Sequence, residues 1–246
     1  MELASLRLDV ALVEMSLAPT REISKKLIEN SLVQVDGKIQ TKPSFKVFDT
    51  SDIVVLENNF TRYVSRGAFK LEAALDLFKI DVSGFTAVDF GASTGGFTDL
   101  LLQRGAEKVY AIENGVGQLH PKLLSDKRVV SLENINARYI EKGFIPLCDI
   151  AVMDVSFISQ TKLFTSVLNV LKDGAYFVSL IKPQYEAGKS ALNKKGIVKN
   201  PSDIERAINF VKEQAKICGF VFIGITESPI LGGDGNKEFL VCFKKG

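Results

Sequence analysis

Hydrophobic and polar positions divide the chain into two stretches with different periodicity. In the first stretch, apolar residues recur twice at helical spacing and then in two short runs of strand length. Thr20 stands where an N-cap belongs, and Asp36-Gly37 is a strong signal for a hairpin turn. The expected elements are helices over 7–15 and 21–32 and strands over 32–35 and 52–56. Together they predict a small α+β unit.

From residue 66 onward, apolar runs of strand length alternate with stretches of helical spacing. The expected strands are 85–90, 108–112, 128–132, 149–154, 175–182, 220–226 and 238–243. The expected helices are 67–79, 96–104, 118–126, 160–172 and 202–218. This alternation predicts helices on both faces of a mostly parallel sheet, and the helix-free connection before the last strand favours an antiparallel final strand. We therefore predict an α/β chain with a small α+β domain at 1–58, a linker at 59–65 and a Rossmann-like seven-stranded domain at 66–246.

A glycine-rich turn, DFGASTGGFTD at 89–99, follows the first strand of the larger domain. Glycines have no Cβ, so the turn can tighten and its backbone can approach a ligand at the carboxyl end of the strand. Glu113 closes the next strand, where a carboxylate accepts hydrogen bonds from ribose hydroxyls. Asn136, after the third strand, is expected near an adenine ring, with a plain turn residue as the alternative. The expected cofactor-binding residues are Asp89, Gly91, Ser93, Thr94, Gly95, Gly96, Glu113, Asn136 and Asp154.

The turn and the acid alone fit two classes of enzyme. The spacing is G-x-x-x-G-G and not the dinucleotide pattern G-x-G-x-x-G, yet an acid at Glu113 serves NAD equally well. A methyltransferase is favoured over a dehydrogenase, and the dehydrogenase stays open on these residues.

Four ionisable residues stand at the ends of apolar segments in the larger domain. Asp154 and Lys182 end two central strands, Glu238 begins the last strand, and Lys70 lies on the helix before the sheet. Burying charges there is costly unless they are paired or functional. Methyl transfer to a ribose hydroxyl needs a base, and a second cation nearby disfavours an ammonium. Lys182 is the expected base and Lys70 its cationic neighbour, with a solvated Lys70 and a gatekeeping Glu238 as structural alternatives.

Five motifs follow one another along the chain: SRGAFKL, DFGASTGGFTD, DVSFIS, IKPQYEAG and GNKEF. In this order they resemble the TlyA (hemolysin A) family of bacterial rRNA 2′-O-methyltransferases, which is itself similar to FtsJ-type enzymes. The resemblance implies S-adenosylmethionine as methyl donor and the ribose of cytidine in ribosomal RNA, free or in subunits, as acceptor. It places the family's K-D-K-E tetrad at Lys70, Asp154, Lys182 and Glu238. Asn114 and Lys195-Gly196 depart from the family pattern without touching the tetrad.

The N-terminal unit resembles the RNA-binding module of ribosomal-protein-S-four-like domains. It has RLD at 7–9, Thr20-Arg21 in place of Ser-Arg, and VQVDG at 33–37, but Ser31 replaces the usual Gly. Its Lys and Arg number 7 against 9 Asp and Glu, so a protein-interaction module is the alternative. For the basic loop at 189–199, the alternative is a solvated excursion. The expected RNA-binding residues are Arg7, Arg21, Lys25, Lys26, Arg62, Arg66, Lys189, Lys194, Lys195 and Lys199.

Other function classes lack their sequence features. A base-amino methyltransferase closes the fourth strand with an acidic-Pro-Pro-aromatic signature where this chain has DVSF, and a cytosine-carbon enzyme needs a Cys after a Pro. The longest charge-free apolar stretches are far short of the roughly 20 residues that cross a bilayer, which argues against a membrane-active hemolysin. The three scattered cysteines and lone His120 form no metal pattern. We expect a cytoplasmic enzyme without a metal.

Overall fold

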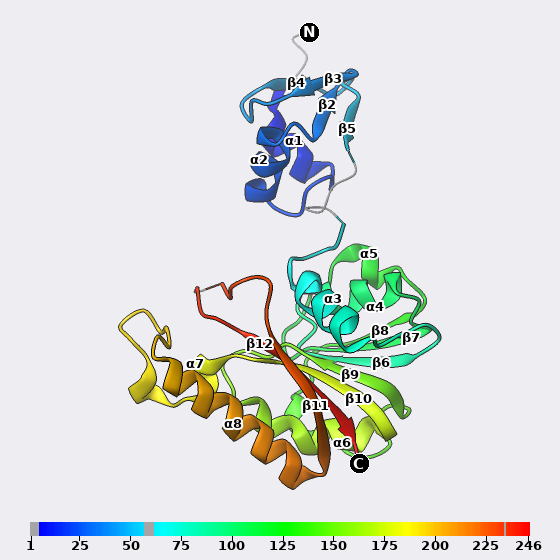
Figure 1. Cartoon of the computed structure of the whole chain (residues 1–246). Coiled ribbons are helices and arrows are strands. Elements are labelled where there is room, and N and C mark those ends of the chain that lie inside the picture. The colour runs from blue at the N-terminus through cyan, green and yellow to red at the C-terminus, as the bar shows by residue number, and fades with distance from the viewer. Residues whose placement is uncertain (1–4, 57–61, 234) are drawn as a thin grey trace. The chain divides into compact units, whose positions relative to one another are not determined.

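A computed structural model of the chain describes residues 5–56, 62–233 and 235–246. The chain divides into two compact units, Met1–Arg66 and Gly67–Gly246, which are described separately below (Figure 1). Residues 59–61 of the predicted linker lie outside the described residues.

The first unit is the α+β module that the periodicity predicts, with one additional small sheet. Its elements are β1 (Ser5–Arg7), α1 (Leu8–Glu14), α2 (Arg21–Glu29), β2 (Val33–Val35), β3 (Lys38–Gln40), β4 (Lys46–Phe48) and β5 (Ile53–Val55). Thr20 caps α2, since its Oγ1 accepts a hydrogen bond from the Ile23 N–H at 3.3 Å. Asp36 and Gly37 have φ angles of 50° and 74° and join β2 to β3 in an antiparallel hairpin. Apolar side chains of both helices and of β2 form a separate core.

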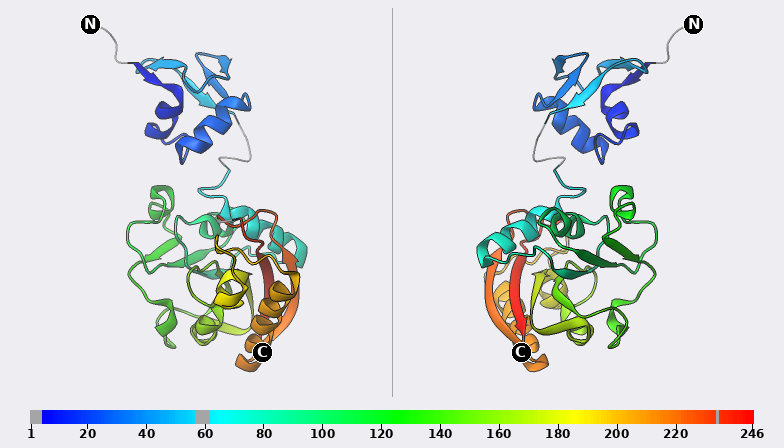
Figure 2. Two further views of the ribbon diagram at one scale, coloured as in Figure 1. Left: turned by 90° about the vertical axis from the view of Figure 1, so that its left-hand side faces the viewer. Right: turned by 90° about the vertical axis from the view of Figure 1, so that its right-hand side faces the viewer.

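The second unit contains a seven-stranded sheet with the order β11-β12-β10-β9-β6-β7-β8. Its strands are β6 (Thr86–Phe90), β7 (Lys108–Ile112), β8 (Val129–Leu132), β9 (Cys148–Met153), β10 (Leu171–Ile181), β11 (Phe220–Glu227) and β12 (Phe239–Lys245). Strand β12 runs antiparallel to both of its neighbours, and the other pairings are parallel. The predicted fold class, including the antiparallel last strand, is confirmed. Figure 2 shows β8 and β11 at opposite edges of this sheet.

Helices cover both faces of the sheet. They are α3 (Gly67–Phe78), α4 (Gly96–Gln103), α5 (Pro121–Leu124), α6 (Phe164–Val170), α7 (Pro183–Glu186) and α8 (Pro201–Cys218), with single 3-10 turns at Ala137–Tyr139, Gln160–Leu163 and Lys189–Ala191. Helices α3 and α4 lie on one face and α6 and α8 on the other (Figures 1 and 2). Against the second face, the rings of Phe164, Phe177, Phe220 and Phe243 pack with centroids 5.1 to 6.5 Å apart.

Two predicted helices are shorter than their apolar patterns suggest. The helix expected at 118–126 is the single turn α5, which begins at Pro121 after the cap residue His120. The helix expected at 160–172 is a 3-10 turn followed by α6, and it ends because Leu171 already pairs with Cys148 in the sheet. At Leu171, pairing in the sheet overrides the local periodicity. Among the helices of the described residues, none has the length and apolar character that a bilayer crossing requires.

Candidate active site

The glycine turn after β6 passes through backbone positions that suit only glycine. Gly91 has φ +79°, and a Cβ there would lie 3.1 Å from the Asp154 carbonyl oxygen. Gly95 has φ +95°, and a Cβ there would collide with the Leu123 side chain on α5. The turn is thus pressed against both α5 and the segment that follows β9.

A cavity of about 590 Å³ opens beside this turn, at the carboxyl ends of the parallel strands. The predicted residues that line it are Gly91, Ser93, Glu113, Asn136 and Asp154. The other predicted cofactor residues, which do not line it, are Asp89, Thr94, Gly95 and Gly96. Lining residues that the sequence analysis missed include Asn114, Gln118, Arg138, Ser156 and Phe157. All five follow the carboxyl ends of β7, β8 or β9, and this position along the chain could have identified them as candidates for the cavity wall.

Glu113 joins the two loops that border the cavity. Its Oε2 accepts a hydrogen bond from the Ser93 N–H and its Oε1 one from the Gly115 N–H, each at 2.9 Å. Asn136 lines the cavity, and its Oδ1 accepts a hydrogen bond from the Arg138 N–H at 3.2 Å, as a turn residue does. Its contact with an adenine ring stays a prediction.

Asp89 is a buried carboxyl behind the turn, with 1% of its surface exposed. Its Oδ2 accepts a hydrogen bond from Thr98 Oγ1 at 2.7 Å, whereas Oδ1 is buried without a hydrogen-bond partner among the described residues. Burial raises the pKa of Asp89 to about 7, the nearby Asp154 carboxylate raises it further, and the bond from Thr98 opposes the rise. A buried acceptor of this kind is costly unless a bound molecule satisfies it.

The four predicted catalytic residues form one line of alternating charge. Lys70 Nζ on α3 lies 2.6 Å from Glu238 Oε2 and 3.7 Å from Asp154 Oδ2. Lys182 Nζ lies 2.6 Å from Asp154 Oδ1, and its aligned hydrogen bond goes to Ser156 Oγ at 2.7 Å. The Glu238 side chain is 3% exposed and the two lysine side chains about a tenth, so each charge is buried only because its neighbours pair it.

Sheet topology explains why these residues meet. Strands β9 and β10 are parallel neighbours, so Asp154 and Lys182 follow them at the same edge of the sheet. Strand β12 is antiparallel and pairs Phe239 with Ile181, which places Glu238 at that edge as well. Helix α3 packs against α4 and β12 and supplies Lys70. The sequence analysis missed Ser156, although it lies only two residues beyond Asp154.

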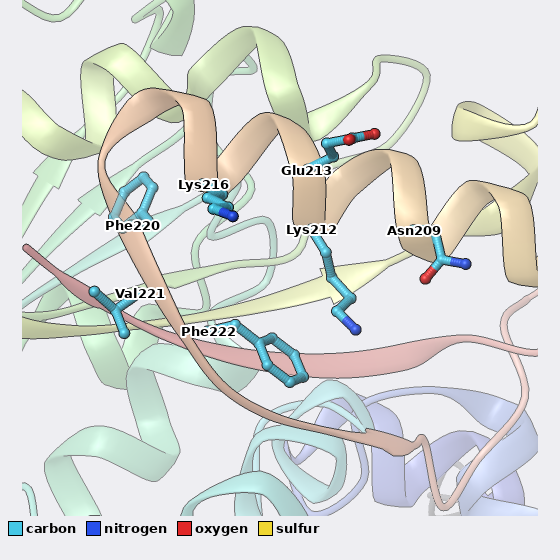
Figure 3. A pocket seen from close by; sticks show the side chains of 7 residues that line it. All are labelled: Asn209, Lys212, Glu213, Lys216, Phe220, Val221 and Phe222. Atoms are coloured by element: carbon cyan, nitrogen blue, oxygen red, sulfur yellow. The ribbon is translucent and has the colours of Figure 1, made fainter.

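A second cavity, of about 510 Å³, lies far from this edge, between α8 and β11 (Figure 3). Phe220 and Phe222 come from β11, and Lys212 from α8 places its Nζ 4.3 Å from the Phe222 ring centroid (Figure 3). Because Phe220 pairs with Lys245, at the end of β12 opposite Glu238, this cavity is separate from the charged residues described above.

Three of the predicted RNA-binding residues of the first unit, Arg7, Arg21 and Lys26, pair with acidic side chains. Asp9 is fully buried, and its carboxylate oxygens accept hydrogen bonds from Arg7 Nε and Arg21 Nε, both at 2.9 Å. The bond from Arg7 is the main cause that lowers the pKa of Asp9. Lys26 pairs with Glu22 at 2.9 Å one helical turn away. The two guanidiniums remain about half exposed, so they are held in place and still reach solvent.

The remaining predicted RNA-binding residues are exposed. Arg62 stacks over the Tyr63 ring at 4.9 Å, and the other exposed residues are Lys25, Arg66, Lys189, Lys194, Lys195 and Lys199. Among the described residues, no group of His, Cys, Asp and Glu side chains is arranged to hold a metal ion.

Two family models match the chain, one for each unit. The FtsJ-like methyltransferase family matches residues 63–245, and the S4 domain family matches residues 6–53. The family match excludes the dehydrogenase that the glycine turn alone left open.

Relatives match over almost the whole length. The "16S/23S rRNA (cytidine-2′-O)-methyltransferase TlyA" of Mycobacterium tuberculosis is 39% identical over 239 residues, covering 97% of this chain and 89% of the relative. "Hemolysin A" of Brachyspira hyodysenteriae is 40% identical over 240 residues, covering 97% and 99%. A solved structure described as a candidate hemolysin from Streptococcus thermophilus is 40% identical, with a TM-score of 0.75 over 99% of this chain and 89% of that one. The chain therefore belongs to the TlyA (hemolysin A) family of FtsJ-like methyltransferases with an N-terminal S4 domain.

Proposed function

We propose that this chain transfers a methyl group from S-adenosylmethionine to the 2′-hydroxyl of a cytidine ribose in ribosomal RNA. The observation that carries the proposal is the line Glu238–Lys70–Asp154–Lys182 beside the cavity at the carboxyl edge of the sheet. The TlyA relative named above is an rRNA (cytidine-2′-O)-methyltransferase, which supports the same acceptor. Such a substrate would place the enzyme in the cytoplasm.

The residues around the cavity fit S-adenosylmethionine. Gly91 adds no side chain to the wall of the cavity, and the Glu113 carboxylate that also lines it suits ribose hydroxyls. When bound, S-adenosylmethionine supplies an electrophilic methyl group on a sulfonium centre. The protein's own part is to hold the acceptor in line, which is worth about 7–11 kcal/mol in well-oriented reactions.

Lys182 is the proposed base for the 2′-hydroxyl proton. Its Nζ contacts Asp154 Oδ1 and Ser156 Oγ. A neutral amine that donates to both of these oxygens keeps its lone pair for the proton of the acceptor hydroxyl. Lys70, held by Glu238, balances the charge of the second Asp154 oxygen. In this scheme Asp154 connects the two lysines.

The S4 unit is the proposed RNA anchor. Arg7 and Arg21, fixed by the buried Asp9, and the exposed Lys25 present positive charge without base-specific chemistry. Contacts of this kind orient a nucleic acid and leave sequence recognition to other groups. Binding energy from such remote contacts places the acceptor at the catalytic edge.

The test is transfer of tritiated methyl from S-adenosylmethionine to purified ribosomal subunits and to free rRNA that lack the modification. We expect label in RNA that survives base hydrolysis as a 2′-O-methylated dinucleotide. Label on a base, or none with a protein that binds S-adenosylmethionine normally, would overturn the proposal.

A further inference from the structure

Asn236 is a buried side chain that the proposed chemistry does not use. It is 1% exposed and stands two residues before Glu238 in the GNKEF motif. Its Oδ1 accepts a hydrogen bond from the Val198 N–H at 3.1 Å, and its Nδ2 donates to the Gly196 carbonyl oxygen at 3.1 Å. The oxygen and the nitrogen of this amide therefore both bind the backbone of the loop 189–199.

That loop is an ordered element. Leu192 and Val198 form an antiparallel bridge, and Asn193 Oδ1 accepts hydrogen bonds from the N–H groups of Lys195 and Ile197 at 2.8 and 3.0 Å. The loop 189–199 that contains this turn exposes four lysines, which are Lys189, Lys194, Lys195 and Lys199. In the described part of the chain, the two bonds of Asn236 are the hydrogen bonds that join this loop to residues 232–239.

On its other side Asn236 is connected to the catalytic carboxylate. The Asn236 carbonyl oxygen accepts a hydrogen bond from the Gly232 N–H at 2.9 Å. Gly232 lies so close to Glu238 that a Cβ there would be 2.5 Å from Glu238 Oε1. Hydrogen bonds thus lead from the loop backbone through Asn236 to Gly232, which lies beside the Glu238 carboxylate that pairs with Lys70.

We propose that Asn236 is a positioning residue that fixes the lysine-bearing loop 189–199 relative to Glu238. RNA phosphates bound by the loop are thereby held at a set distance from the tetrad, and the acceptor ribose is placed with them. The inference rests on the proposed RNA substrate, and neither the tetrad nor the cofactor cavity requires it.

The test is Asn236→Ala in the full-length protein, with Asn169→Ala as the matched control. Asn169 also donates from Nδ2 to a carbonyl, that of Ile140, at 2.9 Å and away from the catalytic edge. Losing two neutral hydrogen bonds is expected to raise the KM for RNA roughly tenfold in Asn236→Ala, with a smaller change in kcat and an unchanged affinity for S-adenosylmethionine. The control is expected to leave the KM for RNA unchanged.

A double-mutant cycle separates positioning from a general loss of structure. In a background with all four loop lysines changed to Ala, Asn236→Ala is expected to have little further effect on KM. An undiminished effect in that background would overturn the proposal. If Asn236→Ala fails to fold, Asn236→Asp serves instead, since it keeps the acceptor for Val198 and loses the donor for Gly196.

Hydrogen exchange of the loop amides tests whether Asn236 holds the loop, independently of whether RNA is the substrate. We expect faster exchange at Val198 and Ile197 in Asn236→Ala than in the wild type or in Asn169→Ala. Unchanged exchange would show that Asn236 does not hold the loop. Faster exchange in a protein that does not methylate rRNA would refute only the proposed function.

Discussion

Replacing Lys182 by Ala removes the group that we place at the acceptor hydroxyl, and its cost follows from the surrounding contacts. A positioned general base contributes about 10²–10⁴-fold, or about 2.7–5.4 kcal/mol in the activation barrier. The folded state loses the bond to Ser156 and one contact to Asp154, but Asp154 keeps Lys70 at 3.7 Å and is not left as a lone buried charge. We therefore expect kcat to fall by about 10²–10⁴-fold while affinity for S-adenosylmethionine stays within a few-fold.

The assay is single-turnover methyl transfer at saturating cofactor and RNA, with cofactor affinity from isothermal titration. Lys172→Ala is the matched control, because Lys172 lies near the beginning of β10, the strand that Lys182 directly follows. It pairs with Asp149 at 2.6 Å, and half of its side chain is exposed. The control is expected to retain full activity. Equal kcat for Lys182→Ala and the wild type would refute the role of Lys182.

Three further changes test other parts of the account. Glu113→Ala should weaken S-adenosylmethionine binding before it affects kcat, and unchanged affinity by isothermal titration would show that the ribose acid is misplaced. The triple change of Arg21, Lys25 and Lys26 to Ala should lower the salt slope of RNA binding by about 0.7 for each lost phosphate contact, and coincident lines of affinity against salt would remove the S4 face from RNA binding. Burial raises the pKa of Asp89 to about 7, above its value in the unfolded chain. Between these two pKa values the native state holds a proton that the unfolded chain releases. The contribution of Asp89 to the free energy of unfolding is therefore full below about pH 4 and is lost as the pH rises through 7. The cofactor-free wild type should therefore lose Tm from pH 5 to 8 relative to Asp89→Asn, and parallel profiles would contradict the burial argument.

Periodicity was sufficient to place the strands along the chain and to predict the α/β class, because buried parallel strands are continuous apolar runs that differ plainly from amphipathic helices. Periodicity failed where a segment's structure depends on the strand with which it pairs. Residues 171–172 were predicted as the end of a helix, yet Leu171 joins the sheet through Cys148. No local pattern in the sequence reports that partner.

The residues of the candidate site also divide into those that the sequence predicted and those that it did not. Asp154, Lys182 and Glu238 were predictable because charges at the tips of apolar strands stand out, and strand order brings them together. Ser156 and Asn236 were not, because small polar residues are common in loops and only their three-dimensional partners distinguish them. The exposed lysines at 189–199 were predicted as RNA contacts, and they stay a prediction until RNA binding is measured.

The most direct test of the central claim is a nucleotide-resolution map of 2′-O-methylation on ribosomal RNA incubated with the purified protein and S-adenosylmethionine. We expect new 2′-O-methylated cytidines with the wild type and with Lys172→Ala, and a yield lower by about 10²-fold or more with Lys182→Ala after the same short incubation. Methylation confined to bases, or the same ribose methylation with Lys182→Ala as with the wild type, would contradict it.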